Sequence, residues 1–124
     1  MLSQSPAFAQ ADYPNKPIKL IVAFPPGGTS DVMGRLVAEE LGKVLKQPIV
    51  VENIGGAGGI VGTDRALKMP ADGYTLSLGS PMELVLAPMA IQGVKYKSED
   101  FKLVAQFATT NTILAVRKQT WFVF

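Results

Sequence analysis

The sequence predicts an α/β fold, with a mainly parallel sheet and flanking helices. Segments 18–24 and 49–53 are short and apolar, as buried strands are, and segment 74–78 alternates in polarity. Each of the three is followed by a loop of small residues and then by helical periodicity. A strand, a helix and a second strand in this order form a right-handed crossover, which makes the paired strands parallel.

The first strand, 18–24, ends at Pro25-Pro26-Gly27-Gly28. The prolines cannot donate to a sheet, and the glycines permit a sharp turn and a close approach to another group. Thr29, Ser30 and Asp31 then offer N-cap side chains, and a 3.6-residue apolar period runs to residue 46. Free N–H groups at such a helix start can bind a carboxylate or phosphate, and a turn that binds nothing is the alternative. One helical face carries Val32, Leu36, Val37, Leu41, Val44 and Leu45.

The later segments continue the α/β pattern. We expect a helix over 60–69, a short helix over 82–89, and a helical turn at 98–100. Two further strands are expected over 103–109 and 112–116. The small-residue loops 25–31, 53–59 and 79–82 each follow a strand. They should therefore gather at the carboxyl edge of the sheet, where α/β proteins bind ligands.

Composition indicates one globular domain and excludes several kinds of site. The 124 residues are 48% hydrophobic and 18% charged, with a net charge of +2 and no basic run, so nucleic acid is not an expected partner. The chain has no cysteine and no histidine. Disulfides, Ser-His-Asp triads and zinc sites built on these residues are therefore excluded, and we expect neither a metal nor a cofactor.

The candidate catalytic motifs are incomplete, so the sequence argues against an enzyme and no catalytic residue is predicted. Gly56-Ala57-Gly58 with Gly62 has the spacing G-x-G-x-x-x-G, one residue longer than a dinucleotide fingerprint. Ser80 lacks the second glycine of a nucleophile elbow and a histidine base. Glu52 and Asn53, at a strand end, are expected either to orient a loop or to contact a ligand, and the structural role is favoured. A small nucleotide-binding α/β enzyme is kept as the alternative function.

Several motifs, in order, resemble one protein family. The segments 13–18, 24–31, 47–53, 56–59 and 72–76 are similar to those of the periplasmic substrate-binding proteins of tripartite tricarboxylate transporters, also called Bug proteins. The resemblance covers about residues 7–118. It implies a two-lobed, type II-like binding protein that closes on a small carboxylated solute and delivers it to a membrane transporter.

The resemblance also implies which residues bind the solute. The loop after the first strand would receive a carboxylate largely through backbone N–H groups, and the loop after the third strand would flank the same cleft. The expected partners are a di- or tricarboxylate, or an amino acid-like ligand, and the membrane components of the transporter. On this chain the two loops supply Phe24, Gly27, Gly28, Thr29, Ser30 and Asp31, then Gly79, Ser80 and Pro81.

The resemblance divides the chain into three parts. Residues 1–11 carry Ala-x-Ala and are interpreted as a signal-peptide remnant or a disordered leader. As given, these residues lack a complete signal peptide. The expected periplasmic location therefore comes from the resemblance. Residues 12–109 would form an incomplete first lobe. Residues 110–124 would begin the crossover to a second lobe and end in an aberrant apolar tail. The chain thus resembles a truncated family member, and a non-functional remnant is a further alternative.

Overall fold

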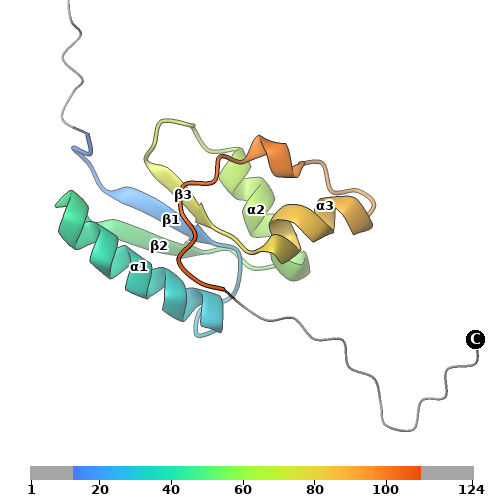
Figure 1. Cartoon of the computed structure of the whole chain (residues 1–124), viewed down its shortest axis with the longest axis horizontal. Coiled ribbons are helices and arrows are strands. Elements are labelled where there is room, and N and C mark those ends of the chain that lie inside the picture. The colour runs from blue at the N-terminus through green and yellow to red at the C-terminus, as the bar shows by residue number, and fades with distance from the viewer. Residues whose placement is uncertain (1–12, 110–124) are drawn as a thin grey trace, which may run out of the picture.

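The structure, a computed structural model, describes residues 13–109 and has the predicted α/β architecture (Figure 1). Helices and strands alternate along the chain, as the small-residue loops and the change of apolar period predict. In order the elements are β1 (Ile18–Val22), α1 (Thr29–Leu45), β2 (Ile49–Asn53), a 3-10 turn (Ala57–Gly59), α2 (Ile60–Leu67), β3 (Thr75–Leu78), a π-helical turn (Met82–Leu86), α3 (Ala87–Ala90) and a 3-10 turn (Ser98–Asp100).

The three strands form one sheet in the order β2-β1-β3, and both pairs are parallel. Ile18 of β1 lies opposite Ile49 of β2, and Lys19 lies opposite Thr75 of β3. The central strand is the apolar segment that the sequence indicated, with Ile21 and Val22 completely buried. The prediction of a mainly parallel sheet is therefore confirmed, and the carboxyl ends of all three strands lie at one edge.

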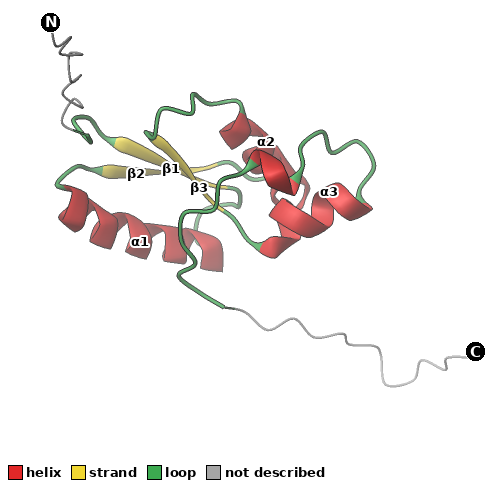
Figure 2. Cartoon of the chain, turned by 45° about the horizontal axis from the view of Figure 1, so that its top comes forward, coloured by secondary structure: helices red, strands yellow, loops and turns green. Residues whose placement is uncertain are grey.

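The helices cover both faces of the sheet (Figure 2). Gly34 of α1 approaches the side chain of Val22, whereas Gly62 of α2 approaches Ala23. Neighbouring residues along an extended chain point to opposite sides. Helix α1 therefore packs on one face, and α2 packs on the other.

The side of α1 that meets the sheet coincides only in part with its apolar face: Val37, Leu41 and Leu45 are half-buried, but other members of that face are exposed. Asp31, Gly34 and Ala38 are the buried residues of the helix. Val32 and Leu36, which belong to the apolar face, are 52% and 54% exposed. Small residues make the contact because the helix lies close to β1: a Cβ on Gly34 would be 2.8 Å from Cγ2 of Val22. Hydrophobic periodicity alone could not identify this close approach.

The start of α1 also differs from the prediction. Gly28 is the N-cap residue, and no side chain caps the helix. Thr29 and Ser30 lie in the first helical turn, and Asp31 instead accepts a hydrogen bond from the Gly27 N–H group, 2.8 Å away. The expected N-cap role of the Thr29, Ser30 and Asp31 side chains is therefore wrong.

The strand predicted over 103–109 is wrong. These residues form no regular element, and Leu103 and Val104 are each 82% exposed. A strand needs a neighbour that accepts and donates backbone hydrogen bonds, and among the described residues no such neighbour lies beside this segment. The strand predicted over 112–116 lies outside the described residues. Within residues 13–109, no helix has both the length and the hydropathy needed to cross a bilayer.

Candidate ligand-binding site

The predicted site residues lie at the carboxyl edge of the sheet. Phe24, Gly27 and Gly28 lie in the connection between β1 and α1, and residues 29–31 form the first turn of α1. Residues 79–81 connect β3 to the π-helical turn. The glycine-rich loop after β2 lies against the first loop and against Glu83 of the π-helical turn, to which Ser80 donates: a Cβ on Gly59 would lie 3.2 Å from Cζ of Phe24 and 3.3 Å from Cβ of Glu83. The predicted convergence of the three loops is thus observed.

Asp31 is a buried carboxylate at this edge. It is 4% exposed, and its Oδ2 atom accepts hydrogen bonds from the Gly27 N–H group at 2.8 Å and from Nε of Arg35 at 3.1 Å. The Nη2 atom of Arg35 lies 3.0 Å from Oδ1 of the same carboxylate. The hydrogen bonds from Arg35 and from the Gly27 N–H group lower the pKa of Asp31 to about 2. The carboxylate is therefore ionised at neutral pH and compensated by one guanidinium.

Asn53, at the end of β2, completes the network. Its Nδ2 group donates to the Phe24 carbonyl oxygen at 3.1 Å and to Oδ1 of Asp31 at 3.0 Å. Asn53 therefore joins the ends of β1 and β2 to the first turn of α1. The structural role expected for Asn53 agrees with these contacts. Sequence reasoning missed Arg35, and its spacing of four residues from Asp31 was the available signal.

The first turn of α1 leaves several donors unused. The N–H groups of Gly28, Thr29 and Ser30 have no acceptor among residues 13–109. The first N–H groups of any helix lack partners within the helix, and together with the helix dipole they favour an anion. The Gly27 N–H group is different, because Asp31 already occupies it. This loop therefore offers a row of donors for one carboxylate group.

The loop after β3 is oriented inward by Glu83. This side chain is completely buried, and it accepts hydrogen bonds from the Ser80 N–H group at 2.7 Å and from the Ser80 hydroxyl at 2.5 Å. Both donors of Ser80 are thus directed at Glu83. The Tyr96 hydroxyl donates to the Glu83 carbonyl oxygen at 2.8 Å, and burial raises the pKa of Tyr96. Gly79 and Pro81 flank Ser80 in the same loop.

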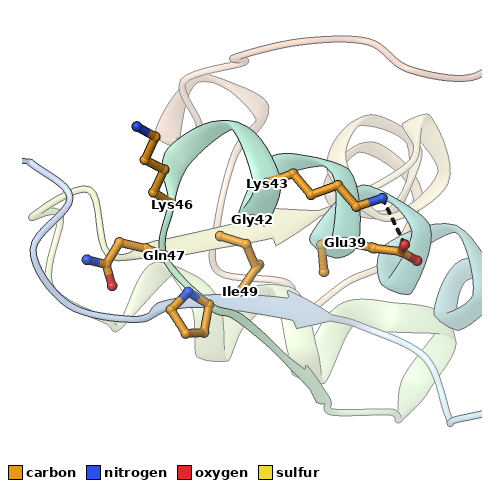
Figure 3. Close-up of a pocket in the computed structure, with 8 residues that line it drawn as sticks. Glu39, Gly42, Lys43, Lys46, Gln47 and Ile49 are labelled. Carbon is orange, nitrogen blue, oxygen red and sulfur yellow. Dashed lines mark ion pairs between the residues drawn. The ribbon is translucent and has the colours of Figure 1, made fainter.

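A surface hollow among the described residues lies away from these loops (Figure 3). It measures about 480 Å³ and lies at the carboxyl-terminal end of α1, beside the start of β2. Lys43 borders it, and its ammonium group pairs with Glu39 at 2.9 Å. The hollow contains none of the predicted site residues. Residues 13–109 also contain no group of three or more acidic side chains placed to hold a metal ion.

A comparison with protein families identifies the chain. Residues 33–121 match the family described as the tripartite tricarboxylate transporter family receptor, TctC. The chain belongs to this family. Over 79 residues it is 53% identical to Protein BugT of Bordetella pertussis, a match that covers 64% of this chain and 23% of BugT.

Solved structures agree with this assignment. MatC of Rhodopseudomonas palustris, with bound malate, superimposes with a TM-score of 0.68 and 33% identity, and the match covers 72% of this chain and 31% of MatC. A second R. palustris protein, with adipate, gives a TM-score of 0.66 and 32% identity over 71% of this chain and 29% of that chain. Two other similar structures are described as a periplasmic transporter and a periplasmic binding protein. The chain thus spans about a third or less of the length of its relatives.

Proposed function

We propose that this chain provides one half of the ligand site of a periplasmic solute-binding receptor, and that it binds a small dicarboxylate rather than catalysing a reaction. The observation that carries the proposal is the row of unused N–H groups at Gly28, Thr29 and Ser30, at the carboxyl edge of a parallel sheet. An anion placed there gains charge-assisted hydrogen bonds and a favourable helix dipole.

The ligands of the relatives support this class of solute. Malate is bound to MatC and adipate to the second R. palustris protein, and both molecules carry two carboxylate groups. We infer that the β1–α1 loop takes one carboxylate, while Gly79, Ser80 and Pro81 border the same cleft. Because Ser80 donates to Glu83, we infer that this loop shapes the cleft rather than holding the charge.

The remaining parts of the proposal concern the whole receptor. Residues 13–109 would form part of one lobe, and a second lobe would close over the ligand and deliver it to the membrane components of the transporter. Two alternatives make different predictions. A nucleotide-dependent enzyme would respond to NAD or ATP at the amides of Gly56 to Gly59, and a non-functional remnant would bind none of these molecules.

The test is a ¹H–¹⁵N correlation spectrum of the 124-residue chain, titrated separately with malate, adipate, NAD and ATP. We expect the dicarboxylates to shift the amide signals of Gly27 to Asp31, and the nucleotides to shift none. Shifts confined to the amides of Gly56 to Gly59 on addition of nucleotide, with none on addition of the dicarboxylates, would favour the enzyme. No shift with any of the four molecules would refute the proposed function for this chain.

A variant at Gly28 sharpens the test. A Cβ on Gly28 would meet nothing nearer than the Pro25 carbonyl oxygen at 3.6 Å, and the backbone there is extended, so Gly28→Val is compatible with the fold. The added side chain would obstruct approach to the N–H groups, and we expect affinity for malate to fall at least about tenfold. Asn15→Ala serves as the comparison, because its side chain accepts a hydrogen bond from the Tyr74 hydroxyl and Asn15 belongs to neither predicted site loop. Unchanged malate affinity in a folded Gly28→Val variant would contradict the assignment of this loop.

A further inference from the structure

The site contains a buried carboxylate at the place where a ligand carboxylate is expected. Asp31 holds the Gly27 N–H group at 2.8 Å, so this donor is not free for a solute. Two carboxylates that competed for one N–H group would also repel each other. Either the ligand displaces Asp31, or Asp31 stays and the ligand uses the donors that follow.

The contacts of Asp31 favour the second arrangement. Its carboxylate accepts hydrogen bonds from three different segments of the chain: the β1–α1 loop, the Arg35 side chain on α1, and the Asn53 side chain at the end of β2. Displacing it would leave a buried charge without these partners, which is costly. A side chain bonded in this way stays in place while the unused N–H groups bind.

We propose that Asn53 and Arg35 are positioning residues, which hold Asp31 against the Gly27 N–H group so that only the N–H groups of Gly28 to Ser30 meet the ligand carboxylate. Asn53 holds the loop at two points, because its Nδ2 group donates both to Asp31 and to the Phe24 carbonyl oxygen, the latter at 3.1 Å. Asp31 itself does not touch the solute. This inference rests on the proposed function and assigns roles within the same site.

The test compares five forms of the 124-residue chain: wild type, Asn53→Ala, Asp31→Ala, the double variant and Asn15→Ala. Asn15→Ala is the matched control, because Asn15 also uses its side chain to join two segments, accepting from the Tyr74 hydroxyl at 3.0 Å. For each form, amide hydrogen exchange of Gly27 is measured without ligand, malate affinity is measured by titration, and stability is measured by urea unfolding.

The inference predicts a specific pattern. Exchange at Gly27 accelerates about tenfold or more in Asn53→Ala and in Asp31→Ala, and malate affinity falls about tenfold. The double variant binds malate no more weakly than the weaker-binding single variant, because both residues act through one loop. Asn15→Ala loses stability with unchanged Gly27 exchange and unchanged affinity.

Two results would overturn the inference. One is Gly27 exchange in Asn53→Ala equal to that in Asn15→Ala, which would mean that Asn53 does not hold the loop. The other is faster exchange with unchanged malate affinity, which would mean that this geometry does not serve binding. If the wild-type chain binds neither malate nor adipate, the proposed function fails, while the exchange data still decide whether Asn53 and Asp31 order the loop.

Discussion

Gly62 in α2 lies where the helix crosses the end of β1, and replacing it with alanine should destabilise the fold. A Cβ at this position would be 2.3 Å from the Ile54 carbonyl oxygen and 2.7 Å from Cα of Ala23. Both are backbone atoms of segments that flank the sheet, so neither can move aside as a flexible side chain could. The helix would have to shift away from the sheet to admit one methyl group.

Two effects of opposite sign set the magnitude. Alanine is favoured over glycine in a helix interior by about 1 kcal/mol. Overpacking a tight contact costs about 1 to 3 kcal/mol, and two backbone contacts this short indicate the upper end of that range. We therefore expect Gly62→Ala to lower the free energy of unfolding by about 2 kcal/mol.

Urea unfolding followed by far-UV circular dichroism measures this change. The control is Gly42→Ala in α1, also a helical glycine, where the nearest atom to a new Cβ is the Gln47 carbonyl oxygen at 3.3 Å. We expect the free energy of unfolding of Gly42→Ala to be unchanged or higher by up to about 1 kcal/mol. Equal stability of Gly62→Ala and Gly42→Ala would refute the reasoning, because helix propensity would then outweigh the close approach.

Three further predictions follow from buried and exposed groups. Because the pKa of Asp31 is lowered to about 2, its ionised carboxylate should stabilise the fold fully above about pH 4, and this contribution should be lost as the pH falls towards 2. In Asp31→Asn, the free energy of unfolding should therefore depend less on pH over this interval. Tyr96→Phe should cost about 1 to 3 kcal/mol in urea unfolding, because the Glu83 carbonyl oxygen loses its hydrogen-bond donor; a cost near zero would contradict this account. Leu103→Ser and Val104→Ser should each change stability by less than about 0.5 kcal/mol, since both side chains are largely exposed, and a larger loss would show that this segment packs.

The order of strands and helices could be predicted because its signals are local. The Pro-Pro-Gly-Gly run ends β1, a 3.6-residue apolar period begins after it, and the right-handed crossover rule makes the next strand parallel. The carboxyl-edge location of the three loops follows from this order alone. The segment 103–109 shows the limit of such reasoning, because an apolar, β-branched stretch forms a strand only beside a partner, and none lies there among the described residues.

The sequence by itself determined the α/β class, the family and the loops of the candidate site, because these depend on spacing within short segments. Only the tertiary structure decided which side of α1 is buried and where the polar side chains point. Gly34 meets the sheet because the two backbones lie close together, and Asp31 turns inward because Gly27, Arg35 and Asn53 converge on it. Asp31 and Asn53 are 22 positions apart in the sequence, and their side chains come within hydrogen-bonding distance because β1 pairs with β2 and α1 packs against the sheet.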